Sequence, residues 1–196
     1  DRDFSASFEI DFKNLSNFSI DFSYPYTYLD SEFNVTRRDG AVPIPIGGYN
    51  YPNLEISFRN GFFNKFSYFI EFGGGQFFNG NKKSLQLRLN YRIEPIVQTS
   101  LNISYDKIEL PKPYDNADLW LIGPKIKFTF NKKIFWSNYI QYSNIGESLG
   151  INSRLQWRFA PLSDFYLVYN DNYFASDIFA PKLRSLTFKL SYWFNI

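Results

Sequence analysis

Apolar and polar residues alternate one by one along most of this chain of 196 residues. The stretch from Leu85 to Ile93 is the clearest case, because every second residue is apolar and the residues between are Gln, Arg or Asn. Successive side chains of a β-strand point to opposite faces, so this period predicts strands with one apolar and one polar face. No stretch has convincing helical spacing, and we therefore predict an all-β fold.

The alternating stretches are long, and we expect about eleven strands. They lie near residues 3–12, 18–29, 49–59, 66–77, 84–93, 97–108, 119–130, 134–143, 151–159, 165–174 and 184–196. Each covers roughly nine to twelve residues, whereas ordinary strands have about five or six. A strand that crosses a bilayer at a tilt needs about nine to eleven residues. These lengths favour an antiparallel transmembrane β-barrel of the outer-membrane type.

The connections between these stretches fall into two alternating classes. The tight class comprises residues 13–17, 60–65, 94–96, 131–133 and 160–164. The longer class comprises residues 30–48, 109–118, 144–150 and 175–183, with the Asn79-Gly80 turn as its short member. Outer-membrane barrels have short turns on the periplasmic side and longer loops outside, so the alternation favours the same fold.

The aromatic content bears on the direction of the apolar face. The chain has 23 Phe and 15 Tyr, yet its mean hydropathy is −0.32. In a soluble lipocalin-like barrel, which is the alternative fold, the apolar face would point inward and these rings would overfill a small core. In a membrane barrel the same face contacts lipid and the polar face lines the lumen. We therefore predict the membrane barrel.

Strand parity bears on the domain organisation. We treat residues 1–196 as one outer-membrane β-barrel domain. If the last strand ends in the periplasm, an odd number of strands means that the first strand begins on the outer side. Bacterial barrels instead have an even number of strands and begin and end in the periplasm. We therefore expect this chain to be the C-terminal part of a longer protein, with strands N-terminal to it completing the barrel.

The chain contains no His and no Cys. This composition excludes Ser-His-Asp and thiolate catalysis, and it excludes zinc sites with His or Cys ligands. The net charge of +2 gives no reason to expect nucleic acid as a partner. We predict no catalytic residues, cofactors or metal ligands, and a surface enzyme is a disfavoured alternative.

Charged residues at the polar positions of the strands are candidates to line the lumen. The acidic candidates, on the first four strands, are Glu9, Asp11, Asp21, Glu55 and Glu71. The basic candidates, on later strands, are Arg88, Arg92, Lys125, Lys127, Arg154, Arg158 and Lys189. One interpretation is a transverse field that orients or selects polar solutes. The other is a set of salt-bridged pairs that fills and rigidifies the barrel.

Two segments interrupt the strand pattern. Gly73, Gly74 and Gly75 lie within a predicted strand, which indicates a bend or close backbone packing. The segment Val42–Gly48, VPIPIGG, contains two prolines and is predicted to be a loop folded into the mouth of the barrel.

The C-terminal quarter resembles a known family. Residues 152–171 contain Asn-Ser-Arg, an apolar residue and Trp-Arg, followed by a Pro-x-Ser-Asp turn and Phe-x-Leu-Val-Tyr-Asn, and the last strand ends in Tyr-Trp-Phe. These motifs are similar to the C-terminal end of Bacteroidota outer-membrane barrel proteins of unassigned function, with Leu162 where that pattern has Gly. Longer members carry an N-terminal domain similar to family 9 carbohydrate-binding modules. The resemblance implies the outer membrane of a Gram-negative bacterium and no known activity.

The last strand also resembles the C-terminal signal by which barrel-assembly machinery recognises outer-membrane proteins. Its alternating residues are Phe188, Leu190, Tyr192 and Phe194, and Asn195-Ile196 follow the final aromatic residue. The expected partners are therefore the lipid bilayer and, during biogenesis, the assembly machinery.

The predicted function is that of a membrane anchor or porin-like pore for a larger, carbohydrate-related surface or periplasmic protein. The alternative is a structural subunit that docks with other outer-membrane proteins. Solute flux through the barrel would favour the pore, and a closed lumen with a partner on the outer wall would favour docking.

Overall fold

The computed structural model describes residues 2–36, 40–174 and 177–194, and these ranges contain thirteen strands and no helix. The strands are β1 (Ser5–Asp11), β2 (Asn17–Ser23), β3 (Tyr26–Leu29), β4 (Gly47–Asn50), β5 (Asn53–Arg59), β6 (Phe66–Phe77), β7 (Gly80–Ile93), β8 (Val97–Glu109), β9 (Ala117–Thr129), β10 (Ile134–Ser143), β11 (Ser148–Ala160), β12 (Ser163–Phe174) and β13 (Asp177–Ser191). The described ranges hold no helix suited to crossing a membrane. The all-β prediction is confirmed.

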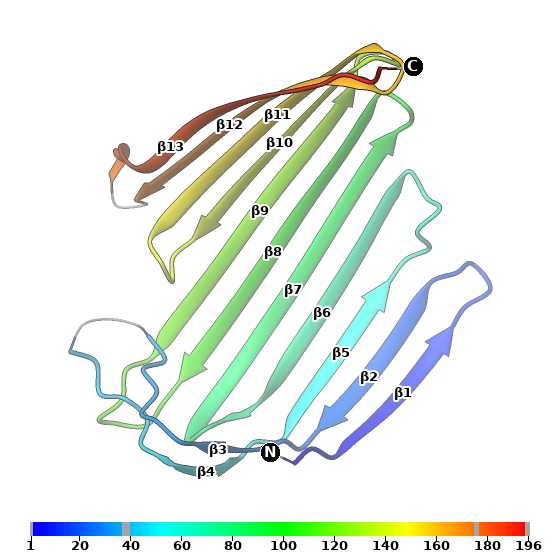
Figure 1. Cartoon of the computed structure of the whole chain (residues 1–196). Coiled ribbons are helices and arrows are strands. Elements are labelled where there is room, and N and C mark those ends of the chain that lie inside the picture. The colour runs from blue at the N-terminus through cyan, green and yellow to red at the C-terminus, as the bar shows by residue number, and fades with distance from the viewer. Residues whose placement is uncertain (1, 37–39, 175–176, 195–196) are drawn as a thin grey trace. The chain divides into compact units, whose positions relative to one another are not determined.

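Eleven of these strands form one antiparallel sheet, and β3 pairs with β4 in a separate two-stranded sheet. The large sheet follows the chain in the order β1-β2-β5-β6-β7-β8-β9-β10-β11-β12-β13, which is a meander (Figure 1). The order begins at β1 and ends at β13, so within the described residues the sheet is not closed into a barrel. The chain packs as two compact units, Asp1–Arg88 with Ile103–Trp120, and Leu89–Asn102 with Leu121–Ile196.

Two predicted strands are each broken in two, and a proline lies at each break. The predicted strand 18–29 divides into β2 and β3 around Pro25, and the predicted strand 49–59 divides into β4 and β5 around Pro52. Proline has no backbone N–H to donate to a ladder, so it ends the pairing where it occurs. The two breaks lie side by side, because the N–H of Tyr51 donates to the carbonyl of Pro25 at 3.2 Å. The predicted loop Val42–Gly48 is partly wrong, since Gly47 and Gly48 begin β4.

The predicted alternation of short and long connections is only partly correct. The segment between β2 and β5 and the loop between β8 and β9 are long, as expected. The predicted loop 175–183 is wrong, because β13 begins at Asp177 and pairs with β12, although Ala175 and Ser176 lie outside the described residues. Register shifts near Tyr173 accommodate Pro181 in this ladder. The turn between β10 and β11 is also shorter than predicted.

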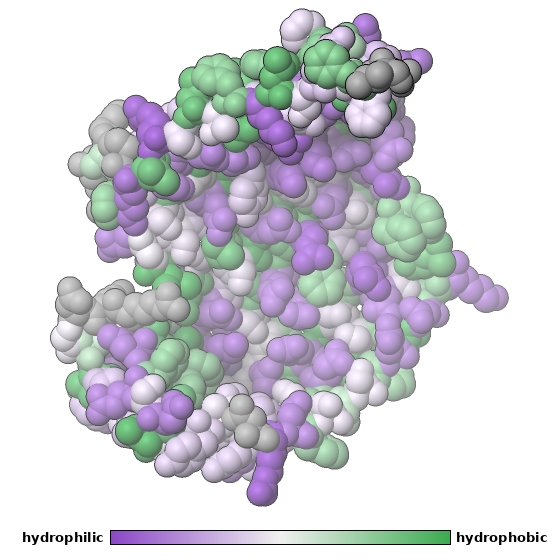
Figure 2. All heavy atoms as spheres, in the orientation of Figure 1, coloured by the Kyte–Doolittle hydropathy of each residue, from purple (hydrophilic) through white to green (hydrophobic). Residues whose placement is uncertain are grey.

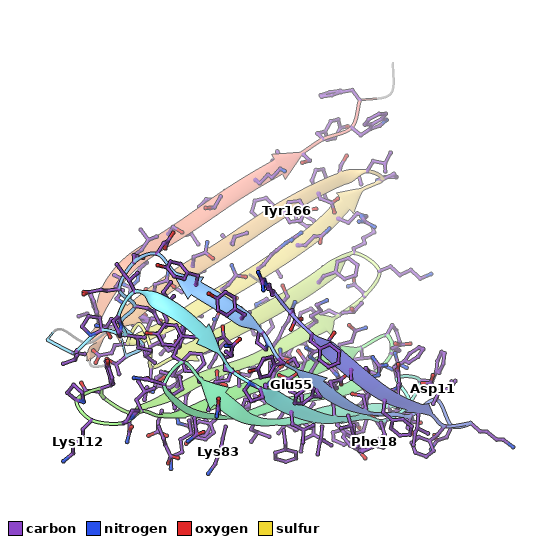
Figure 3. The ribbon with its side chains drawn as sticks, turned by 90° about the horizontal axis from the view of Figure 1, so that it is seen from below. Asp11, Phe18, Glu55, Lys83, Lys112 and Tyr166 are labelled. Carbon is purple, nitrogen blue, oxygen red and sulfur yellow. The ribbon has the colours of Figure 1, made fainter. Side chains whose placement is uncertain are left out.

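The pairing of the strands separates the two faces of the first unit. Asp21 of β2 lies opposite Glu55 of β5, whereas Phe18 lies opposite Phe58 and Ile20 opposite Ile56. Figure 3 shows Glu55 and Phe18 on opposite faces of these strands. We call the two sides the polar face and the apolar face. Figure 2 displays the polar face, where hydrophilic side chains gather.

The second unit has the same two faces. On β11 and β12, the apolar face pairs Leu155 with Leu167 and Trp157 with Phe165, while the polar face pairs Asn152 with Asn170. A hydrophobic core is almost absent from both units. The only fully enclosed hydrophobic residues among those described are Ile44, Ile108 and Ala117. Large apolar side chains instead lie exposed on the apolar face.

The segment between β2 and β5 packs against the end of β6 and its following turn to form a small aromatic cap in the first unit. We define the aromatic cap as Phe33, Tyr49, Tyr51, Phe77 and Phe78. Phe78 is its centre, with ring centroids 5.5 Å from Phe33, 5.2 Å from Tyr49, 5.6 Å from Tyr51 and 4.7 Å from Phe77. The φ angle of Phe78 is 51°, which is costly for a bulky residue. These ring contacts hold Phe78 in that conformation.

Replacing Phe78 with Ala is expected to lower the pKa of Tyr49. Burial raises the pKa of the Tyr49 phenol above its ordinary value, and Tyr114 raises it further. Removing the central ring admits water, which favours the phenolate and moves the pKa back toward about 10. Phe63→Ala is the control, because the Phe62–Phe63 ring pair lies in the turn between β5 and β6. An NMR titration of labelled tyrosine rings measures both variants, and an unchanged Tyr49 titration in Phe78→Ala would contradict the expectation.

Candidate functional site

The structure brings the predicted acidic residues together on the polar face of the first unit. Glu9 and Asp11 lie on β1, Asp21 on β2, Glu55 on β5 and Glu71 on β6. The ladders place Ser7 opposite Asp21, Asp21 opposite Glu55, and Ser57 opposite Glu71. Glu71 lies close enough to Glu55 and Asp21 for repulsion between their charges. The four strands therefore carry one acidic surface.

Hydroxyl and amide groups hold the acidic side chains in place. Asp21 accepts hydrogen bonds from Ser7 at 2.6 Å and from Ser19 at 2.7 Å. The amide of Asn17 donates to Asp11 at 2.9 Å and also to Glu9. These donors are neutral, so they hold the carboxylates in place without forming ion pairs.

A similar pairing supports Glu55. The Asn53 amide donates to Glu55 at 2.8 Å. Arg88 borders the acidic surface, because its guanidinium lies 5.7 Å from the Phe69 ring and interacts electrostatically with Glu71. Phe69 is on the polar face, opposite Arg59. Arg88 is therefore the basic candidate that the structure places beside the acidic ones.

The other basic candidates lie in the second unit. Lys127 is opposite Ser137, and Ser137 is opposite Arg154, so these two cations are two strands apart, or about 10 Å. Lys125 lies one rung away, opposite Tyr139, and Lys189 lies opposite Tyr166. Most basic candidates thus share the polar face of one unit.

Ion pairs and ring contacts fix several of these cations. The Arg158 Nε lies 3.3 Å from Asp164, and Gln156 donates to the same carboxylate at 3.0 Å. The Arg154 guanidinium lies 4.7 Å from the Tyr166 ring. Arg92 lies 3.5 Å from Glu94, next to the turn between β7 and β8. Arg158 and Arg92 therefore have acidic partners that the sequence did not suggest.

The assembly-signal candidates lie on the exposed apolar face. Phe188 is 64 % exposed, Leu190 67 %, Tyr192 56 % and Phe194 76 %. Tyr192 packs edge-on against Phe194, with centroids 4.5 Å apart. Asn195 and Ile196 lie outside the described residues. The structure thus places the candidates on one face, and their recognition by assembly machinery stays a prediction.

Sequence reasoning missed a charged cluster on the apolar face of the second unit. Asp171 of β12 is fully buried and lies opposite Arg184 of β13. Its Oδ2 accepts hydrogen bonds from Arg184 Nε at 2.8 Å, from the Tyr173 hydroxyl at 2.5 Å and from the Tyr169 hydroxyl. The sequence does contain a signal for this cluster. Asp171 continues the every-second-residue series of Leu167 and Tyr169, which lie on the apolar face. Arg184 begins the corresponding series of Leu186 and Phe188. A charge in the apolar phase of two adjacent strands predicts such a pair.

The described residues contain no group of three or more His, Cys, Asp or Glu able to hold a metal ion. Comparison with protein-family models, with curated proteins and with solved structures finds no match to this chain. The resemblance to a Bacteroidota family therefore stays a prediction.

Proposed function

We propose that this chain forms part of the wall of an outer-membrane β-barrel, which acts as a membrane anchor or pore for a larger protein. The supporting observation is the separation of the two faces combined with an almost empty core. A water-soluble sheet buries its apolar face, whereas here large apolar side chains lie exposed along it. In lipid, this face contacts hydrocarbon and the polar face lines an aqueous lumen.

The open edges of the sheet support a barrel completed by further strands. Every residue of β1 is exposed, and in the described strand order β1 and β13 each have a single neighbour. Unpaired backbone groups cannot remain in hydrocarbon, because each costs several kcal/mol there. Strands from another segment or another chain would satisfy these edges and close the wall. A carbohydrate-related partner rests on the family resemblance alone.

The charges on the polar face support the pore interpretation. The acidic surface occupies the first unit, and Lys125, Lys127 and Arg154 occupy the second. Opposite charges on different stretches of a lumen would orient dipolar solutes. The docking subunit remains the alternative outcome of the test below.

The test is folding of the chain into phospholipid vesicles. We expect β-structure by circular dichroism, heat-dependent mobility on a gel and resistance to protease only when lipid is present. Conductance across planar bilayers then distinguishes an open pore from a closed docking subunit. A folded monomer that remains soluble without lipid or detergent would overturn the proposal.

A further inference from the structure

A groove lies on the apolar face of the second unit. Its lining includes Trp136 of β10, Ser153 and Leu155 of β11, Leu167 and Tyr169 of β12, and Leu186 of β13. Its volume is about 340 Å³, which falls at the lower end of the range for ligand pockets. Its walls are aliphatic and aromatic, so it suits a hydrocarbon chain.

The groove exists because one small residue interrupts a face of large ones. Ser153 lies opposite Asn138 on one side and opposite Tyr169 on the other. The indole Nε1 of Trp136 donates to the Ser153 hydroxyl at 3.0 Å, so this hydroxyl does not require water. The groove is therefore apolar in character, although Ser153 is part of its lining.

The charged cluster of Asp171 and Arg184 lies directly beyond the groove, at the next residue pair on the same face of β12 and β13. Tyr169 and Leu186 line the groove and are opposite each other, and the next outward pair along the same strands is Asp171 and Arg184. This step is about 7 Å along the strand. Asp171 is buried, and its Oδ1 has no hydrogen-bond partner among the described residues. The Arg184 side chain is 55 % exposed, so it presents a fixed cation at one end of an apolar groove.

A second cation lies near the same end. The Lys182 amine donates to the carbonyl of Gly146 at 3.1 Å and lies 4.2 Å from the Phe174 ring. Gly146 belongs to the turn between β10 and β11. Arg184 and Lys182 thus place two cations at one end of the second unit.

We infer that this groove binds one acyl chain of an anionic phospholipid, with the lipid phosphate at Arg184. The inference rests on the proposed membrane location. Arg recognises phosphate with paired hydrogen bonds, and Asp171 fixes the guanidinium before the lipid arrives. The apolar lining and the cation at its end together match an anionic amphiphile. A zwitterionic phospholipid fits the groove but lacks the net negative charge that the cation favours, and free phosphate matches only the cation.

The experiment uses the chain folded in vesicles of phosphatidylcholine with a minor share of phosphatidylglycerol. Lipid retained after mild detergent extraction is identified by native mass spectrometry. We expect phosphatidylglycerol to be enriched over phosphatidylcholine, and we expect Arg184→Gln to reduce that enrichment about fivefold, as for one cation near a membrane surface. Lys189→Gln, which removes a cation from the polar face, is the matched control and should leave the enrichment unchanged.

A second variant keeps the test valid if Arg184→Gln folds poorly. Ser153→Phe fills the groove and leaves both cations in place, so retention of lipid should fall, whereas Ser153→Ala should retain it. Adding inorganic phosphate should not displace the lipid, because the acyl chain supplies part of the binding. Failure to insert into vesicles overturns the proposed function itself. Insertion with equal retention of both lipids, or displacement by phosphate alone, overturns only the lipid site.

Discussion

Phe188→Arg is expected to lower the free energy of unfolding in lipid by about 2–4 kcal/mol, as for Arg near the middle of a bilayer. Along β13 the apolar face carries Arg184, then Leu186, Phe188 and Leu190, so Phe188 lies within the apolar stretch. Its side chain is already 64 % exposed. At an exposed site in water, such a change usually alters stability by less than about 0.5 kcal/mol. A large loss would therefore come from lipid contact.

Thr187→Arg is the matched control, because Thr187 is the preceding residue and points to the polar face, opposite Val168. We expect this variant to fold with little change. Denaturant titrations of both variants in the same vesicles give the comparison. Equal effects of the two changes would mean that neither face meets lipid, and a larger loss for Thr187→Arg would reverse the assignment of the faces.

Gly75→Ala is expected to cost about 1–3 kcal/mol of stability, as overpacking does in a well-packed site. A Cβ at Gly75 would lie 2.1 Å from the carbonyl oxygen of Pro52 and 2.7 Å from the Cα of Asn53. Both contacts are to backbone, so no side chain can rotate away. The ladder between β5 and β6 must shift to make room, which weakens the hydrogen bond from Gln76 to Pro52 at 2.9 Å.

Gly74→Ala is the control for this substitution. The closest neighbour of a Cβ at Gly74 is the carbonyl oxygen of Lys82 at 3.9 Å, which is an ordinary contact. The two variants differ only in position, so backbone entropy affects them alike. We expect Gly74→Ala to be neutral or slightly stabilising in the same titration. Equal losses would show that glycine flexibility matters here, and not close approach.

The strands could be predicted because a single local signal determines them. Alternation decides both the existence of a strand and the face of each residue, and this is why Glu55 and Asp21 were placed on one surface correctly. The glycine run was also predicted, since Gly75 lies against the backbone at Pro52. Such features need only the pattern of neighbouring residues.

Other features depend on contacts between distant segments. The ladder partner of Pro181 is Tyr173, and nothing local to residues 175–183 reveals that β13 continues there. The burial of Asp171 likewise depends on the guanidinium of Arg184 from the next strand, in addition to the hydroxyls of Tyr169 and Tyr173 on its own strand. Pro25 and Pro52 were visible in the sequence, but the apolar alternation around them outweighed the missing N–H groups in our prediction.

The paired breaks at Pro25 and Pro52 make the intervening segment a separable module. Ser23 and Asn53 are opposite each other in the large sheet, next to the two breaks. The register of β2 and β5 is therefore set before the chain leaves this sheet. The part of this insert that lies between Pro25 and Pro52 can therefore lengthen or shorten while Ser23 and Asn53 keep the strands beneath it in register. The residues of this insert can therefore change without changing the strand pairing of the large sheet.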